Sequence, residues 1–361
     1  MTRPNPPPLP GWADHVLLPL LNLGLALALT AALMAALGRD PAATLHALFI
    51  GSVGSIDALL YTLYYATDLV FAGLAVAVAF QGGLFNIGVE GQASLAGIGA
   101  ALAMLGTDRG PAWACVPLAI VTGALFGAAW GALPGWLQAK RGSHIVITTI
   151  MLNFIAASLT VYLLVNVLIA PGSMAPETRR FTSGLPVLPA GLFGSAAPVN
   201  LALPLALLAA FGVWLLVWRT PWGFLLRVMG ESADVARYAG VDQVRMVVGA
   251  MALSGALASG VAVNELLGAQ HRLLLGFTGG AGFSGIAVAL MGRNHPIGIV
   301  LAALLFGALT QGGAELAFDV PDVPSEIVIL VQGLIILLAG AMGHLLRPGL
   351  ASVLGRRRVA A

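Results

Sequence analysis

Long apolar runs alternate with short polar joints along most of this chain. Stretches of about 18 or more apolar residues are typical of membrane-crossing helices, because about 20 residues at a rise of 1.5 Å cross the hydrocarbon. The runs are too long, and alternate too weakly, for the strands of a membrane barrel. They predict an all-α, polytopic transmembrane helical bundle of about ten spans, with a range of eight to ten. The ten segments lie at about 16–37, 66–82, 90–106, 113–138, 144–169, 199–218, 246–267, 273–291, 297–316 and 326–345.

Two parts of this pattern leave alternatives open or predict packing. Residues 42–65 are amphipathic, and they either lie at the outer interface or extend the second span. In the segment at 113–138, four glycines recur every fourth residue and form one stripe of a helix. Such stripes let membrane helices approach closely. The stripe consists of Gly123, Gly127, Gly131 and Gly135.

Composition agrees with a membrane protein and divides the chain into three parts. Hydrophobic residues make up 59% of the 361 positions, and the mean hydropathy is +0.94. A Pro-rich tail at 1–15 lacks the features of a cleaved secretory signal. It precedes a transmembrane domain at 16–346, and a basic tail follows at 347–361.

The distribution of Lys and Arg predicts the orientation. With ten spans, 12 of the 17 basic residues fall on one side of the membrane and 5 on the other. The richer side carries both termini and the loop at 219–245, so all three are expected in the cytoplasm. The longest loop on the other side, 170–198, is rich in Pro and Gly. It is either a contact for a delivery partner or a variable surface loop.

The loop from Arg219 to Arg245 departs from the apolar pattern. Seven of its 27 residues are charged, against 9% of the whole chain. Ser232 is a suitable N-cap for a short helix over Ala233–Ala239, and Gly240 suits the left-handed residue that ends it. A short, polar, doubly capped helix between membrane spans favours docking into a groove on a partner.

Polar residues also enter the membrane sequence at 81–100, which reads QGGLFNIGVEGQASLAGIGA. A glutamate at membrane depth is costly unless it is paired or wet, and glycines permit an unwound backbone. Two interpretations stay open: these residues cap helix ends and brace the bundle, or they line the pathway of a transported solute. The candidates for the pathway are Phe85, Asn86, Glu90, Gln92 and, in a later span, Asn153.

The sequence lacks the motifs of several kinds of functional site. The single lysine, Lys140, is followed by Arg141, so the chain has no phosphate-binding G-x-x-x-x-G-K-[ST] loop. The glycines of GGAGFSG at 279–285 match a dinucleotide motif only formally, and a broken or closely packed membrane segment fits better. The histidines are scattered without metal-ligand spacing, and the lone Cys115 excludes an internal disulfide.

Two stretches resemble the permease subunits of bacterial ABC importers, in the superfamily that carries branched-chain amino acids, ribose and nucleosides. They are GLFNIGVEGQASLAGIGAAL at 83–102 and LLRVMGESADVARYAGVDQVRMVVGAMALSGALASGVA at 225–262. The likeness extends from about 66 to 346. The NIGxEGQ string is most similar to the nucleoside or simple-sugar branch, whose permeases work as unlike pairs.

The resemblance implies that the loop around 230–240 is the coupling helix, which seats in the ATP-binding subunit. The family pattern is LRxxGENxxAAxYAGI, and this chain departs from it at Ser232, where Asn is usual. Ser caps a helix as well as Asn does, so coupling is still expected. The implied coupling residues are Arg227, Gly230, Glu231, Ser232, Asp234, Arg237, Tyr238 and Gly240.

The resemblance also implies the partners and the compartment. The chain is expected in the bacterial inner membrane, as a transport subunit and not an enzyme. It binds no cofactor, since ATP and Mg²⁺ belong to a separate ABC ATPase. A second permease, or a second copy of this chain, completes the pathway, and a periplasmic or lipoprotein solute-binding protein delivers a nucleoside or simple sugar. The lipid bilayer surrounds the spans, and no nucleic acid is expected.

The residues alone leave two alternative functions open. An ion-coupled secondary transporter would need several buried carboxylates along its path. Glu90 is the sole strong candidate, since Glu265 and Glu315 fall near the outer ends of their segments. A membrane enzyme would need clustered ligands or a nucleophile with its base, and the sequence suggests neither.

Overall fold

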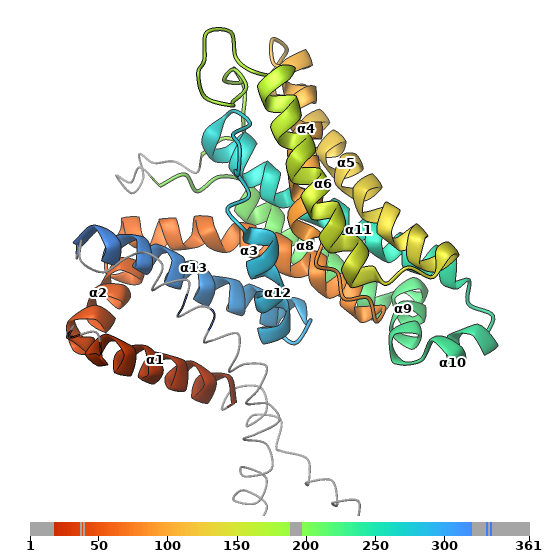
Figure 1. Cartoon of the computed structure of the whole chain (residues 1–361), viewed down its shortest axis with the longest axis horizontal. Helices are drawn as coiled ribbons and strands as arrows, with labels where there is room; N and C mark the ends of the chain where they lie inside the picture. The colour runs from red at the N-terminus through yellow and green to blue at the C-terminus, as the bar shows by residue number, and fades with distance from the viewer. Residues whose placement is uncertain are drawn as a thin grey trace, which may run out of the picture. The chain divides into compact units, whose positions relative to one another are not determined.

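The computed structural model describes residues 18–36, 38, 40–187 and 197–319, together with Leu330 and Gly333 (Figure 1). The predicted tails and nearly all of the tenth predicted segment lie outside the described residues. The helices are α1 (Leu18–Ala36), α2 (Pro41–Val53), α3 (Ile56–Gln81), α4 (Val89–Thr107), α5 (Ala112–Arg141), α6 (Ile145–Asn166), α8 (Ala202–Arg219), α9 (Pro221–Glu231), α10 (Ala233–Tyr238), α11 (Gln243–Ala262), the π-helix η2 (Val263–Gln270), α12 (Ala281–Met291) and α13 (Pro296–Asp319).

Seven helices of the described part are long and apolar enough to cross a membrane. They are α3, α4, α5, α6, α8, α11 with its continuation η2, and α13 up to Leu316. They correspond to the second to seventh and the ninth predicted segments. Helix α1 covers the first.

The eighth predicted segment, 273–291, is wrong as a continuous span. Its first part is a series of turns, and only α12, with 11 residues, is helical. The reason lies in the backbone, because Gly276, Gly279 and Gly280 have φ of 73°, 54° and 79°. Three left-handed residues in five interrupt a right-handed helix, and hydropathy does not register this.

The amphipathic region at 42–65 falls in two separate helices. Its first half forms α2, whose N-cap Asp40 accepts hydrogen bonds from the nitrogens of Ala42 and Ala43. Its second half extends the second predicted span, because α3 begins at Ile56. In total, 83% of the most apolar stretch of α3 is buried, against 28% for α6 and α8.

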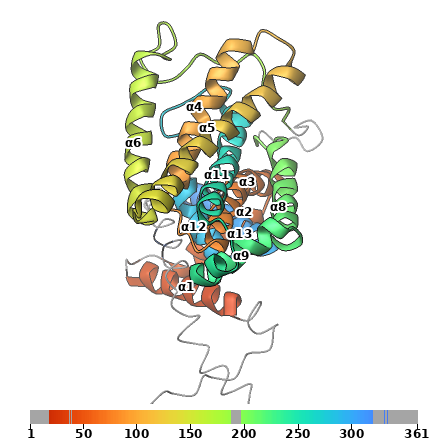
Figure 2. The same ribbon diagram turned by 90° about the vertical axis from the view of Figure 1, so that its right-hand side faces the viewer.

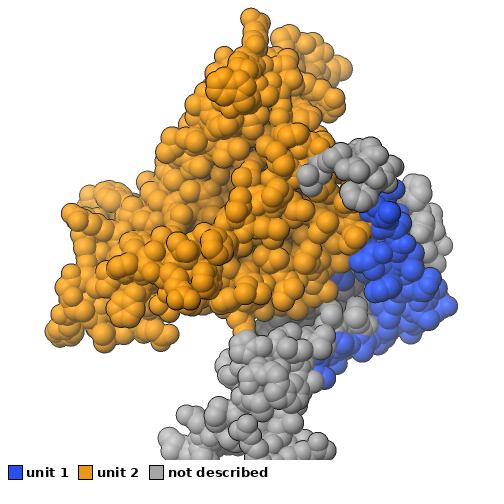
Figure 3. Space-filling view, turned by 180° about the vertical axis from the view of Figure 1, so that it is seen from behind, with its two compact units in different colours: residues 1–58, 309–361 blue, residues 59–308 orange. Residues whose placement is uncertain are grey.

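The chain divides into two compact units, residues 1–58 with 309–361, and residues 59–308 (Figure 3). In the first unit, α2 packs on the end of α13: a Cβ added to Gly51 would stand 2.7 Å from the Cβ of Glu315. In the second unit, α5 packs along both α4 and α11, and α4 also contacts α6 (Figure 2).

The predicted glycine stripe of α5 forms this contact between helices. All four of its glycines are buried. A Cβ on Gly123 would stand 3.2 Å from the carbonyl oxygen of Ala96 in α4, and one on Gly135 would stand 3.0 Å from the Cβ of Met251 in α11. Gly127 meets Gly255 backbone to backbone. The stripe therefore brings the three helices together at a spacing that larger side chains would prevent.

Candidate functional site

The charged loop contains two helices, of which the sequence predicted one. Helix α9 begins at Pro221, and the hydroxyl oxygen of Thr220 accepts a hydrogen bond from the nitrogen of Gly223 at 3.1 Å. Leu226 and Met229, on one face of this helix, are buried. The signal was present, since a Thr N-cap before Pro is typical of a helix start. The apolar residues three apart mark the buried face.

Helix α10 follows the sequence prediction closely. Ser232 is its N-cap, and its hydroxyl oxygen accepts from the nitrogen of Val235 at 3.3 Å. Gly240 has φ of 78°, and the nitrogen of Val241 donates to the carbonyl oxygen of Ala236 at 3.0 Å. This left-handed glycine with a returning hydrogen bond is a Schellman-type end. The helix is one residue shorter than predicted, ending at Tyr238.

Helix α10 is anchored by one small residue and presents the others outward. Ala236 is wholly buried, whereas the side chains of Val235 and Tyr238 are 58% and 94% exposed. Asp234 and Arg237 are exposed as well. An aromatic and two charged side chains stand in solvent on a rigid, capped element, which suits recognition by another protein.

The loop that leads from α10 into α11 is held by polar contacts. The side-chain nitrogen of Gln243 donates to the carbonyl oxygen of Ala233 at 2.5 Å, and Arg237 donates to the side-chain oxygen of Gln243 at 3.3 Å. Arg245 pairs with Asp242 at 3.0 Å. Gln243 therefore ties the start of α10 to the start of α11.

The end of α9 packs directly on the turn between α3 and α4. A Cβ added to Gly83 would stand 3.3 Å from the Cα of Gly230. One added to Gly82 would stand 2.7 Å from the Cδ1 of Leu226 and 3.2 Å from the Cε of Met229. The two chain segments meet where neither backbone carries a side chain. The position of α9 is thereby tied to the position of the turn.

Two hollows flank this contact. One, of about 680 Å³, is lined by Gln81, Arg227, Glu231, Arg293 and Asn294 among others. The other, of about 480 Å³, is lined by Gln138, Arg237, Gln243 and Val244 among others. Both border Gly83, Gly230 and Ser232. Of the predicted coupling residues, the structure thus gathers Arg227, Gly230, Glu231, Ser232 and Arg237 around one patch.

Within the turn between α3 and α4, Asn86 is the centre of a buried hydrogen-bond network. Its side-chain nitrogen donates to the Oε1 of Gln92 at 3.1 Å and to the hydroxyl oxygen of Ser254 at 2.9 Å. Its oxygen accepts from the nitrogen of Gly88 at 2.8 Å. Ser254 donates in turn to the carbonyl oxygen of Ala75 at 2.5 Å. Asn86 therefore links the turn to α4, α11 and α3.

Glu90 joins α4 to the start of α12. Its Oε2 accepts from the nitrogen of Gly282 at 2.8 Å, and its Oε1 accepts from the hydroxyl of Thr278 at 2.5 Å. A carboxylate at a helix N-terminus is stabilised by the helix dipole and by the free N–H groups there. These contacts give Glu90 a bracing part in the bundle.

The last two pathway candidates, Asn153 and Phe85, contact different parts of the protein. In α6, Asn153 accepts from the nitrogen of Gly91 at 3.0 Å and donates to the carbonyl oxygen of Ile87 at 2.9 Å. Phe85 packs edge-on against Phe80, with ring centroids 5.9 Å apart. Asn86 and Gln92 are in direct contact, whereas Glu90 and Phe85 bind other partners.

A second buried polar group was missed from the sequence. Asp68, inside α3, is only 6% exposed, and its carboxylate accepts from the side-chain nitrogen of Asn264 at 3.1 Å. Asn264 also accepts from Asn200 at 2.9 Å, and the hydroxyl of Tyr64 donates to Glu265. Asp68 was overlooked because the predicted span began at residue 66, which placed it at the edge.

Ion pairs hold the loop at 170–187 against neighbouring segments of the chain. Arg179 donates to both carboxylate oxygens of Asp108, at 2.7 and 2.9 Å, and Arg272 pairs with Glu177 at 2.9 Å. The guanidinium of Arg179 holds the pKa of the Asp108 carboxyl below its usual range. Burial lowers the pKa of His271, with the charge of Arg180 as a second cause. In residues 170–187 this loop is therefore an ordered surface.

Metal ligands do not gather in the described part of the chain, where no group of three His, Cys, Asp or Glu side chains could hold an ion. Cys115 is buried. Its thiol donates to the carbonyl oxygen of Thr107 at 2.8 Å.

Comparison with known proteins identifies the family of this chain. The family described as the permease component of the branched-chain amino acid transport system matches residues 58–340. The chain belongs to this permease family. The permease contains both the capped helix α10 and the Asn86 turn within the matched region. Its function is therefore transport as a permease subunit of an ABC transporter, and the family does not favour the ion-coupled alternative.

Curated relatives match the permease over most of its length. It is 37% identical over 345 residues to the guanosine ABC transporter permease protein NupP of Bacillus subtilis, covering 93% of this chain and 98% of the relative. It is 33% identical to the glucose ABC transporter permease protein TsgB13 of Haloferax volcanii (91% and 87%). The nucleoside ABC transporter permease protein NupB of Lactococcus lactis is 32% identical (89% of each chain).

Proposed function

We propose that this permease imports a nucleoside or simple sugar across a bacterial inner membrane, driven by ATP hydrolysis on a separate ABC ATPase. The observation that carries the proposal is the contact of Gly230 with Gly83. It joins α9, which leads through Ser232 into the exposed, capped helix α10, to a turn whose side chains enter the membrane bundle. The relatives named for guanosine, nucleosides and glucose support this substrate class.

In this proposal the coupling residues act at the ATPase contact. The exposed Tyr238, Asp234 and Arg237 touch the ATPase surface, and Ser232 and Gly240 keep the helix in shape. Arg227 and Glu231 border the hollow beside it. ATP and Mg²⁺ bind to the partner, and the force passes through Gly230 to the α3–α4 turn.

The pathway needs further partners. A second permease, or a second copy of this chain, completes it, and a periplasmic or lipoprotein binding protein delivers the solute at the side of the ordered loop at 170–187. In this proposal the broken segment at 273–291 still crosses the membrane, so that about ten spans leave both termini in the cytoplasm and helices α9 and α10 on the ATPase side. Asn86, Glu90, Gln92, Asn153 and Phe85 then lie between the coupling helix and the solute.

Reversing one exposed charge tests this proposal. In proteoliposomes with the ATPase and the binding protein, Arg237→Glu should abolish ATP-dependent uptake of labelled guanosine and glucose. Capture of solute by the binding protein should stay intact. Arg141→Glu, also exposed but at the end of α5, is the matched control. Full uptake by Arg237→Glu would remove the coupling role, and uptake of neither solute by the native complex would remove the substrate class.

A further inference from the structure

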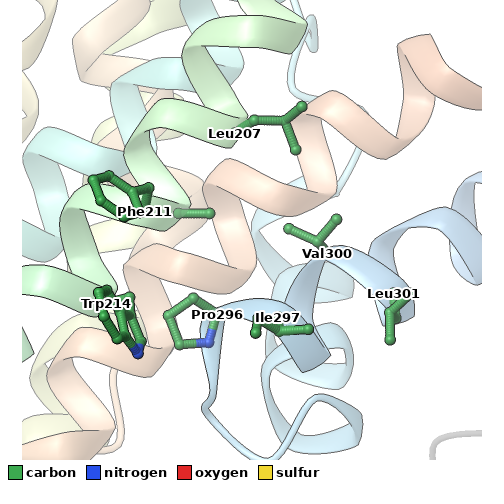
Figure 4. A pocket seen from close by; sticks show the side chains of 8 residues that line it. Leu207, Phe211, Trp214, Pro296, Ile297, Val300 and Leu301 are labelled. Carbon is green, nitrogen blue, oxygen red and sulfur yellow. The ribbon is translucent and has the colours of Figure 1, made fainter. Parts of the chain in front are cut away.

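An apolar groove lies between α8 and α13 in the unit of residues 59–308 (Figure 4). Its volume is about 430 Å³. The groove is open, because the side chains of Phe211, Ile297 and Leu301 are 60%, 66% and 64% exposed. The walls are formed by Leu207, Phe211 and Trp214 of α8 and by Ile297, Val300 and Leu301 of α13.

The groove belongs to the membrane-spanning part of both helices. The spans run over Ala202–Arg219 and Pro296–Leu316, so every lining residue lies within them. Aliphatic and aromatic walls without a charged side chain suit a hydrocarbon occupant.

One end of the groove is cationic and aromatic. The guanidinium of Arg219 lies 5.1 Å from the ring centre of Trp214, which lines that end. On the facing side, His295 directly precedes Pro296, and its ring centre lies 5.0 Å from that of Trp218. Arg219 is exposed and forms no ion pair with any residue that the structure describes. Trp beside a basic residue is typical of the level of the lipid headgroups.

We propose that this groove binds an acyl chain of an anionic phospholipid, whose phosphate is held by Arg219. Basic side chains beside membrane helices attract anionic headgroups, and the planar guanidinium matches the oxygens of a phosphate. The acyl chain then covers Phe211 and Ile297, while Trp214 lies at the junction of chain and headgroup. The chemistry distinguishes this site from the general lipid boundary, because it combines a shaped apolar groove with a cation free to bind a phosphate.

The proposal is tested by measuring which lipids stay bound to the purified permease. The purified full-length permease is exchanged into nanodiscs of equal phosphatidylglycerol and phosphatidylcholine, released into mild detergent, and weighed by native mass spectrometry. The native chain should retain phosphatidylglycerol in preference to phosphatidylcholine. Arg219→Gln should lower that preference about five-fold, as expected for one basic group at the surface. Ala210→Trp, which fills the groove, should abolish retention of both lipids.

A matched control and a second variant keep the test decisive. Arg245→Gln removes an arginine whose side chain is 87% exposed and lies outside the groove, and it should leave retention unchanged. Ala210→Leu fills the groove more gently if the tryptophan variant fails to fold. Equal retention of both lipids in all variants would show boundary lipid only and overturn the proposal. The proposal would also be overturned if Ala210→Trp retained as much lipid as the native chain but no longer paired with a second permease. A second permease would then occupy the groove.

Discussion

Gly83 and Gly230 lie backbone against backbone: a Cβ added to Gly230 would stand 3.0 Å from the nitrogen of Gly83 and closer still to the carbonyl of Gln81. This contact joins the charged loop to the turn that leads to Asn86. It offers a short route by which movement of α9 and α10 reaches the membrane bundle, without any flexible side chain between.

Gly230→Ala tests that route. The added methyl group cannot fit without separating α9 from the turn, so we expect uptake to fall about tenfold or more while the ATPase stays bound. Uptake and ATP hydrolysis are measured in the same proteoliposomes. Gly212→Ala is the control, because a Cβ there meets nothing within 4 Å. Equal loss in both variants, or in neither, would contradict the route.

Glu90→Gln should destabilise the protein. The amide keeps the shape but loses the charge at the N-terminus of α12, which costs about 1–2 kcal/mol. The apparent melting temperature in detergent is the measurement. Glu315→Gln is the control, since Glu315 accepts from Gln311 of its own helix. Uptake across pH, measured alongside, tests the pathway role: an unchanged profile in Glu90→Gln would leave bracing as the only role of the charge.

Asn264→Leu should be more severe. It removes the partners of Asn200 and of the buried Asp68 carboxylate, along with a 3.3 Å hydrogen bond to the carbonyl oxygen of Tyr64. Each buried polar group left without its hydrogen-bond partner costs about 1–3 kcal/mol. Thermal unfolding should show that loss. Asn166→Leu, at an exposed helix end, should change little. Similar melting temperatures for both variants would refute the importance of the network.

The loop at 170–187 should loosen in acid. Because Arg179 lowers the folded-state pKa of Asp108, their interaction stabilises the fold fully above the unfolded pKa of about 3.9. It is lost as the pH falls through the lower folded value. Protease cleavage within 170–187, followed from neutral pH down to about pH 2, measures this loss. Asp108→Asn should be cleaved readily at every pH, and a native chain equally resistant throughout would contradict the ion pair's role.

Much of this fold follows from local sequence signals. Ser232 and Gly240 predicted the ends of α10, because caps depend on neighbouring residues alone. The stripe containing Gly127 predicted close helix packing, since its period matches one face of a helix. Apolar length predicted α3 and six other helices for the same local reason, and charge distinguished the loop at 219–245 from the membrane segments.

The rest depends on contacts between distant residues or on backbone conformation. Nothing near Gly83 in the sequence indicates that Gly230 lies against it. Asp68 could not be paired with Asn264 from hydropathy, which records apolar content and not partners. The turns before α12 follow from left-handed glycines such as Gly280, whose φ no apolar window reveals.

Cross-linking tests the central claim, that α10 is the part of the permease that contacts the ATPase, most directly. Cys115 is buried, so a cysteine replacing the exposed Tyr238 becomes the one accessible thiol of the described chain. Labelled there with a maleimide–benzophenone reagent and illuminated in membranes with its partners, Tyr238→Cys should cross-link to the ATPase. Trp113→Cys, at an 80% exposed position at the start of α5, should not. Cross-linking from Trp113→Cys alone, or from neither position, would contradict the claim.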